Sequence, residues 1–103
     1  MSGNQFQKVG NMNRSEIWLV NSDHTVGHEI KKTGPALIIQ NDYGNKYSSL
    51  TIIAPITFQR LDKVSPVEVF LPKSSSGLVK GSKVLLNQIR SVYKRRLVRR
   101  LER

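Results

Sequence analysis

Residues 35–56 read PALIIQNDYGNKYSSLTIIAPI, and this stretch decides the kind of fold that the chain can adopt. Two runs rich in branched apolar residues, Pro35–Gln40 and Leu50–Ile56, stand on either side of a segment with turn chemistry, Asp42–Asn45. Runs of this length that are bounded by Asn, Asp and Gly are typical of β-strands joined by a turn. Because both runs are almost continuously apolar, we expect strands that are covered on both faces.

Further runs of the same character lie outward from this stretch, at Glu16–Val20, Pro66–Leu71 and Lys83–Ile89. Turn-forming residues separate the runs at Asn21–Asp23, Leu61–Ser65 and Pro72–Gly81. The run Pro66–Leu71 alternates in a way that predicts one solvated face. The last segment, Val92–Arg103, has an apolar spacing that fits either a helix or a closing strand. Short strands at this spacing predict a mainly β fold, a small barrel.

The length and composition of the chain predict one compact domain. The chain has 103 residues, of which 38% are hydrophobic, and such a composition suits a single core. We assign the polar residues 1–12 to a mobile N-terminal lead-in and residues 13–103 to the domain. The longest apolar stretches fall short of the roughly 20 residues of a membrane-spanning helix, and the N-terminus has no apolar signal core. We therefore expect a soluble, cytoplasmic protein without a membrane partner.

The residue types that are missing limit the chemistry. The chain has no cysteine and only two histidines, so a thiol nucleophile is excluded and a metal site is poorly supported. No Gly-rich phosphate-binding loop is present. We expect no metal and no cofactor, and chemistry that uses oxygen and nitrogen groups.

The charge favours a polyanionic partner. The formal net charge is +10, and residues 94–103 contain six cations and one acid. A positive excess of this size attracts nucleic acid through its phosphates. The alternative for the basic end is a solvated segment that only aids solubility.

Five ordered motifs carry a more specific signal: RSEIWLV (14–20), DHTVGHE (23–29), PALIIQND (35–42), APITFQ (54–59) and LLNQIR (85–90). Together they resemble the MazF/PemK toxins of bacterial type II toxin-antitoxin systems, and the resemblance spans residues 14 to about 101. It implies a small SH3-like five-stranded barrel of the MazF/PemK/CcdB type with short helices, which pairs into a homodimer.

The resemblance also implies an activity and partners. Family members cut single-stranded RNA, including mRNA, at specific sequences without metal, because the 2'-hydroxyl of the substrate attacks the adjacent phosphate and leaves a 2',3'-cyclic phosphate. The implied partners are a cognate antitoxin with an acidic tail and, together with that antitoxin, operator DNA.

The resemblance assigns site residues by position. Thr57 matches the family's second catalytic position, and its hydroxyl could donate to a phosphorane oxygen; Glu29 matches an acid that supports the site. The positions implied to contact RNA are His28, Lys31, Lys32, Gln59, Arg60, Gln88 and Arg90. Simpler roles stay open for several of them. Thr57 could be an ordinary strand residue, Glu29 and His28 could be loop residues, and Arg90 could form a structural ion pair.

The sequence departs from the family at the catalytic arginine. MazF-like members carry that arginine immediately before the proline of the second strand, and here Gly34 precedes Pro35. The PemK-like branch uses an arginine and an aspartate whose positions here correspond to Leu85 and Asn87. We therefore expect RNA cleavage to be weak or absent. The sequence also ends before the position of the family's C-terminal helix, so we expect the domain to lack it.

Three hypotheses for function follow. The chain is an impaired toxin ribonuclease, a non-catalytic family member that binds antitoxin or RNA as a regulatory decoy, or a toxin with another target, as in the related gyrase-poisoning toxins.

Two questions concern aromatic residues. Trp18 is expected to pack in the core or at a dimer interface, and Tyr43 and Tyr47, beside Lys46, could stack on RNA bases or be ordinary surface tyrosines.

Overall fold

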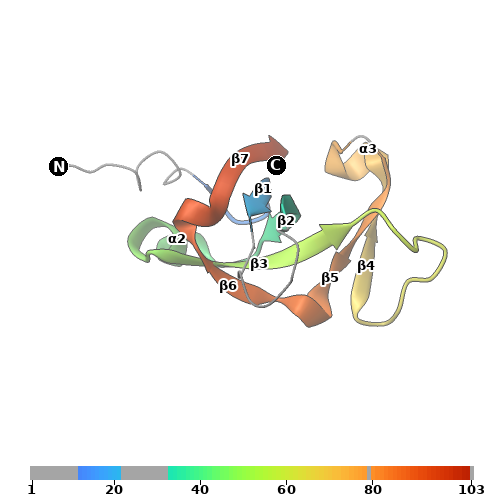
Figure 1. Cartoon of the computed structure of the whole chain (residues 1–103), viewed down its shortest axis with the longest axis horizontal. Coiled ribbons are helices and arrows are strands. Elements are labelled where there is room, and N and C mark those ends of the chain that lie inside the picture. Colours follow the sequence, from blue (N-terminus) through green and yellow to red (C-terminus); the bar gives the residue numbers. More distant parts are fainter. Residues whose placement is uncertain (1–11, 22–32, 79, 103) are drawn as a thin grey trace.

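The computed structural model describes residues 12–21, 33–78 and 80–102. Its strands are β1 (Ile17–Asn21), β2 (Thr33–Ile38), β3 (Leu50–Thr57), β4 (Glu68–Leu71), β5 (Ser82–Leu85), β6 (Arg90–Tyr93) and β7 (Leu97–Glu102). Its short helices are α2 (Asp42–Tyr47), α3 (Lys73–Ser76), η1 (Leu86–Gln88) and η2 (Lys94–Arg96). The fold is mainly β with short helices, as the sequence predicts (Figure 1).

The strands form one antiparallel sheet in the order β4-β5-β3-β2-β1-β7, and β6 also pairs with β3. The long strand β3 lies between β5 and β4 on one side of the strand order and β2, β1 and β7 on the other (Figure 1). Residues Leu50–Ile53 of β3 pair with β6, Ile53–Pro55 pair with β2, and Ile56 and Thr57 pair with β5. β3 thus changes its partners along its length, and the barrel is not closed within the described residues.

Each of the five strand runs expected from the sequence contains a strand. One expected turn is a helix instead, and the segment for which two alternatives were open follows one of them. Asp42–Tyr47 is a helix rather than a turn, because the Asn41 side chain accepts a hydrogen bond from the Gly44 N–H at 2.8 Å and caps it. The segment Val92–Arg103 contains η2 and the strand β7 in place of a longer helix. β7 pairs with β1, so the closing-strand alternative holds.

β4 also differs from the alternating pattern expected for it. Val69 and Phe70 are neighbours in the strand and point to opposite faces, yet 45% and 44% of their surfaces are exposed. Within the described residues, β4 lies at one end of the strand order and pairs with β5 alone. β4 is therefore an edge strand that is wet on both faces.

Buried apolar side chains form two clusters. The first contains Met12, Trp18, Val20, Ala36, Ile38, Ile53, Val92 and Leu97, and the second contains Ile17, Ala54, Ile56, Leu78 and Val84. Trp18 and Ile17 are adjacent in β1 and belong to different clusters, because successive strand residues point to opposite faces. Trp18 therefore packs in the core. Met12 is also buried in the core, although the sequence predicts that it belongs to the N-terminal lead-in.

A buried amide fixes α2 to the sheet. The Asn45 Oδ1 atom accepts hydrogen bonds from Thr51 Oγ1 at 2.7 Å and from Gln40 Nε2 at 3.0 Å. Its Nδ2 atom donates to the Gln40 carbonyl oxygen at 3.0 Å. Asn45 and Thr51 are both almost fully buried, so this network satisfies polar groups that would otherwise be costly inside the protein. It holds the connection between β2 and β3 and thereby aligns these two strands.

Candidate active site

A pocket of about 360 Å³ lies where β2, β3 and the segment 85–90 meet. Its lining residues are Val20, Thr33, Gly34, Pro35, Ala36, Ile53, Pro55, Ile56, Leu85, Gln88 and Arg90. Most of this lining is apolar, and the long polar side chains come from Gln88 and Arg90. The volume falls at the lower end of the range of roughly 300–1,000 Å³ that is typical of small-ligand sites.

Gly34 lines this pocket and leaves it open. A Cβ atom placed on Gly34 would have no neighbouring heavy atom within 4 Å. Its backbone is also acceptable for other residues, because Gly77 is the only glycine in the described part of the chain with a positive φ. A longer side chain at position 34 would therefore extend into free space at the pocket. The site lacks a guanidinium at this position, and the backbone does not forbid one.

Gln88 and Arg90 are brought to the same pocket as Gly34, although they lie far away in the sequence. β3 pairs with β2 on one side and with β6 on the other, and β6 begins at Arg90. Gln88 ends η1, the single turn that joins β5 to β6. Leu85 also lines the pocket, so an isobutyl group occupies the position matched to the arginine of the PemK-like branch. Asn87 is exposed and is not among the lining residues.

Thr57 lies at the end of β3 and is half-buried. The register of β2 with β3 pairs Ala36 with Pro55, and the same count continued by two residues leads to Gly34 and Thr57. The Thr57 Oγ1 atom accepts a hydrogen bond from the Gln59 N–H at 3.2 Å. The hydroxyl proton is still available for donation to another oxygen. The strand register thus brings Thr57 towards Gly34, although Thr57 does not line the pocket itself.

Gln59 and Arg60 lie on the turn that follows β3, and both are exposed. Arg60 has a positive φ of 57° and lines a second, more open hollow of about 570 Å³ with Asp62, Lys63, Val64, Ser65, Glu68 and Lys83. The structure does not bring Arg60 to the pocket of Gly34. His28, Glu29, Lys31 and Lys32 fall outside the described residues, in the connection between β1 and β2.

Lys83 is a residue that sequence reasoning missed. Only 4% of its surface is exposed. Its ammonium donates to the carbonyl oxygens of Arg60 at 2.9 Å and Lys63 at 2.8 Å, and it lies 2.9 Å from Glu68 Oε1. These three acceptors match the three protons of the ammonium group. Lys83 pairs with Thr57 across β5 and β3, yet its charge holds the β3–β4 loop and does not face the pocket.

Glu68, the ion-pair partner of Lys83, has a carboxyl group whose pKa is lowered. The hydrogen bond from Lys83 is the main cause that lowers the pKa of Glu68, and a hydrogen bond from the Ser65 backbone N–H adds to it. No pattern in the sequence reveals such a contact, because two of the three acceptors of Lys83 are backbone carbonyls.

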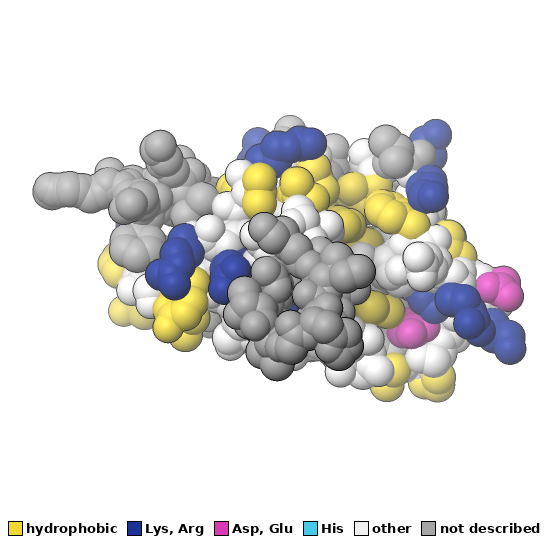
Figure 2. Space-filling model, in the orientation of Figure 1, with side chains coloured by type: hydrophobic (Ala, Val, Ile, Leu, Met, Phe, Trp, Pro, Cys, Tyr) yellow, Lys and Arg dark blue, Asp and Glu magenta, His cyan; other side chains and the backbone are white. Residues whose placement is uncertain are grey.

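Lys and Arg side chains lie at several separate places on the face shown in Figure 2, among apolar and uncharged ones. The acidic side chains visible on this face lie near the β3–β4 loop, beside some of these cations. Lys94 is a buried exception, with 4% of its surface exposed. Burial lowers the pKa of Lys94, and no partner of its ammonium is present among the described residues.

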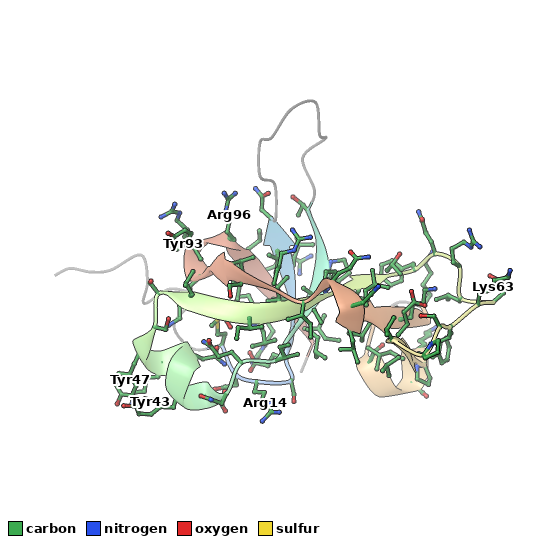
Figure 3. All side chains as sticks on the ribbon, turned by 90° about the horizontal axis from the view of Figure 1, so that it is seen from below. Arg14, Tyr43, Tyr47, Lys63, Tyr93 and Arg96 are labelled. Carbon is green, nitrogen blue, oxygen red and sulfur yellow. The ribbon has the colours of Figure 1, made fainter. Side chains whose placement is uncertain are left out.

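The two tyrosines of α2 are exposed. Tyr43 and Tyr47 expose 77% and 66% of their surfaces, and their ring centroids are 4.8 Å apart. The Lys46 Nζ atom lies 5.4 Å from the centroid of the Tyr47 ring. Figure 3 shows Tyr43 and Tyr47 on one side of β3, with Tyr93 and Arg96 on the other. The aromatic pair is accessible, and its stacking role stays a prediction.

The described residues offer neither a metal cluster nor a membrane-spanning helix. No group of three or more His, Cys, Asp or Glu side chains in this part of the chain is arranged to hold a metal ion. No helix within the same ranges is long and apolar enough to cross a membrane.

Comparisons with known proteins show to which family the chain belongs. Residues 13–103 match the family described as "PemK-like, MazF-like toxin of type II toxin-antitoxin system". The chain is 42% identical over 91 residues to the endoribonuclease MazF of Staphylococcus saprophyticus, a match that covers 87% of this chain and 75% of that protein.

Solved structures agree with this assignment. The crystal structure of MazF from Deinococcus radiodurans superposes with a TM-score of 0.69 at 27% identity, covering 88% of this chain and 79% of that one. A MazE–MazF structure from the same organism gives a TM-score of 0.68 with the same identity and coverage. The chain belongs to the PemK-like, MazF-like toxin family, whose named relatives include endoribonucleases.

Proposed function

We propose that this chain is the toxin of a type II toxin-antitoxin system that binds single-stranded RNA over the pocket of Gly34, and that its RNA-cleaving activity is impaired. The observation that carries the proposal is the open space at Gly34, at the position where MazF-like relatives carry the catalytic arginine. The net charge of +10 favours a polyanionic substrate.

The proposed reaction is an internal transfer within RNA. A new bond forms between the 2'-oxygen and phosphorus while the bond from phosphorus to the 5'-oxygen breaks, leaving a 2',3'-cyclic phosphate and a 5'-hydroxyl. The 2'-proton goes to a base, and the leaving oxygen receives a proton from an acid. Glu29 or His28 is proposed for these proton transfers, and the Thr57 hydroxyl is proposed to donate to a phosphorane oxygen.

The missing element is a donor for the negative charge that develops on the non-bridging oxygens of the phosphorane. An arginine suits this task because its planar fork binds two oxygens of a phosphate at once. Loss of one such donor typically slows a reaction on the order of 100-fold to 1000-fold. Lys32 is the nearest cation in the sequence that could replace it, although an ammonium lacks the fork. The expected outcome is slow cleavage rather than a different reaction.

The proposed partners follow from the family. A MazE–MazF structure is known for Deinococcus radiodurans, and we propose that an antitoxin with an acidic tail binds this chain over its positive surface. A homodimer and joint binding of operator DNA with the antitoxin are proposed on the same ground. The alternative function, a non-catalytic decoy that binds antitoxin or RNA, is favoured by the same glycine at position 34.

The test compares the natural chain with Gly34→Arg and with Gly34→Gln, a control of similar length without a charge. Each protein is incubated with a mixed-sequence RNA in EDTA, and the new ends are mapped. We expect the arginine variant to cut at defined sites at least about 100-fold faster than the other two, with cyclic-phosphate ends. Equally strong cutting by the natural chain and both variants would overturn the impairment. No cutting by any of them would favour the decoy.

A further inference from the structure

Lys83 and Thr57 stand opposite each other on neighbouring strands. The register of β3 with β5 pairs the two residues directly, so their side chains lie on the same face of the sheet. Only 4% of the surface of Lys83 is exposed. A buried cation therefore stands opposite the residue whose hydroxyl is proposed to donate to the phosphorane.

The ammonium of Lys83 is fully engaged by the chain segment that follows Thr57. It donates to the carbonyl oxygens of Arg60 at 2.9 Å and Lys63 at 2.8 Å, and it lies 2.9 Å from Glu68 Oε1. These three contacts account for the three protons of the ammonium. Lys83 thus acts on the protein itself and has no proton left for a phosphate of RNA.

The turn that Lys83 holds has a backbone conformation that needs support. Arg60 has a φ of 57°, in the left-handed region that residues with a side chain rarely adopt. Such a conformation persists only where the surrounding contacts enforce it. The Arg60 carbonyl oxygen accepts hydrogen bonds from the Lys83 ammonium and from the Lys63 N–H, the latter at 3.2 Å. Lys83 therefore helps to keep Arg60 in this conformation.

The same turn holds the Thr57 hydroxyl. The N–H of Gln59, one residue before Arg60, donates to Thr57 Oγ1 at 3.2 Å. This bond occupies one acceptor position of the hydroxyl oxygen, so the hydroxyl proton must point in another direction. Without the bond the side chain could rotate to its other staggered positions.

We propose that Lys83 is a positioning residue for the Thr57 hydroxyl: its ammonium holds the turn at Arg60, and the turn holds the hydroxyl through the Gln59 N–H. The proposal rests on the cleavage function above and adds a residue that does not touch RNA. A donor that is held in place before the reaction is more effective than the same donor free to rotate, because its orientation has not to be found during the reaction.

The first test needs no RNA and follows hydrogen exchange of the Gln59 amide by NMR. Lys83→Met keeps a buried chain of similar length without donors, and Lys83→Gln is a second variant that retains a polar group. Glu68→Gln is the matched control, because its amide oxygen still accepts from the ammonium and both carbonyl contacts stay. Circular dichroism confirms that each variant is folded.

We expect the Gln59 amide to exchange about tenfold faster in Lys83→Met, since its hydrogen bond opens more often. Lys83→Gln should shift the exchange in the same direction, and Glu68→Gln should exchange like the natural chain. Unchanged exchange in both variants of Lys83 would overturn the proposal, whatever the activity of the chain.

The second test is a double-mutant cycle on cleavage of one RNA in EDTA, with Gly34→Arg as the background. Lys83→Met should lower kcat about tenfold and leave KM nearly unchanged, because a misplaced donor weakens the transition state and not the binding of RNA. When Thr57→Val is also present, Lys83→Met should have no further effect on kcat, because the group that it positions is absent.

The outcomes separate this inference from the proposed function. Equal losses of kcat with and without the Thr57 hydroxyl would overturn the inference and limit Lys83 to the stability of the loop. A raised KM at constant kcat would also overturn it. Absence of cutting by Gly34→Arg itself would reject the cleavage function together with any positioning for it, whereas an unchanged Gln59 amide would reject the positioning alone.

Discussion

The Arg100 Nη1 atom of β7 lies 3.2 Å from the Glu16 Oε2 atom at the start of β1, and this ion pair joins the two ends of the described chain. Glu16 is 5% exposed. Its carboxylate also accepts hydrogen bonds from Trp18 Nε1 and from the Asn13 N–H, both at 2.9 Å. One buried carboxylate therefore connects the first strand, the last strand and the tryptophan of the core.

The first prediction concerns the pH dependence that Glu16 confers. Burial by itself raises the pKa of this carboxyl, but the hydrogen bonds from Trp18, Asn13 and Arg100 outweigh it and lower the pKa below the ordinary value of 4.5. The stabilisation is therefore present above that value and is lost as the pH falls through the lower, folded pKa. Glu16→Gln should reduce the free energy of unfolding at pH 7 by about 2 kcal/mol.

Urea unfolding between pH 7 and pH 3 checks this prediction. The difference in free energy of unfolding between the natural chain and Glu16→Gln should become smaller as the pH falls. Asp62→Asn, an exposed acid in the β3–β4 loop, is the matched control and should behave like the natural chain. A gap that stays constant over the whole range would show that the loss comes from packing and not from the charge of Glu16.

Much of the fold follows from local patterns, and the differences have local causes. The apolar runs around Ile53 and Val84 predict strands because short runs rich in branched residues between turn-forming residues are typical of strands. The helix α2 was expected to be a turn, since Asn41 and Gly44 suit both structures, and the choice depends on the buried contacts of Asn45 with Thr51. Tertiary contacts of this kind are not visible in a short window of sequence.

The candidate site was predictable only in part. Gly34, Gln88 and Arg90 were identified by resemblance, and the pairing of β3 with both β2 and β6 explains why they share a pocket. Arg60 was expected there as well, but its turn directs it to a separate hollow. The role of Lys83 could not be predicted, because a lone lysine in a strand gives no sign of the carbonyls that will surround it.

The second prediction concerns Lys94, a buried lysine for whose ammonium the described residues offer no partner. Burial lowers its pKa below the ordinary value of 10.5, so the charged form is unfavourable in the folded state. The resulting destabilisation is complete at neutral pH, diminishes as the pH rises above the folded pKa and is gone above 10.5. Lys94→Met should therefore raise the free energy of unfolding at pH 7 by about 1 kcal/mol.

Thermal and urea unfolding at pH 7 and at pH 10 measure the effect of Lys94→Met. The increase in the free energy of unfolding should be smaller at pH 10 than at pH 7. Lys46→Met, which changes an exposed lysine of α2, is the control and should give no increase at either pH. A loss of stability in Lys94→Met would show that the ammonium has a stabilising partner.

The third prediction concerns Thr57 and uses Gly34→Arg as the background, so that cleavage is fast enough to measure. If the Thr57 hydroxyl donates to the phosphorane, its removal in Thr57→Val should slow cleavage by about 100-fold, whereas Thr57→Ser should keep most of the rate. Valine has the same shape and suits a strand, so the unfolding midpoint should change little. The rate is followed with one cleavable RNA in EDTA, and equal rates for the valine and serine variants would limit Thr57 to a structural role.

The fourth prediction decides between the two roles that the sequence allows for Arg90. In the first role Arg90 contacts a phosphate or a base of RNA, and in the second it forms a structural ion pair. Each phosphate contact on a single strand contributes about 0.7 to the slope of log affinity against log salt concentration. Arg90→Gln should weaken RNA binding and reduce that slope by about this amount. Lys63→Gln is the matched control, since Lys63 lies at the tip of the β3–β4 loop away from β6 (Figure 3), and its slope should stay that of the natural chain. If Arg90→Gln instead lowers the melting temperature and leaves the slope unchanged, Arg90 acts through the stability of the fold, and the positive charge that guides RNA must be sought in the connection between β1 and β2.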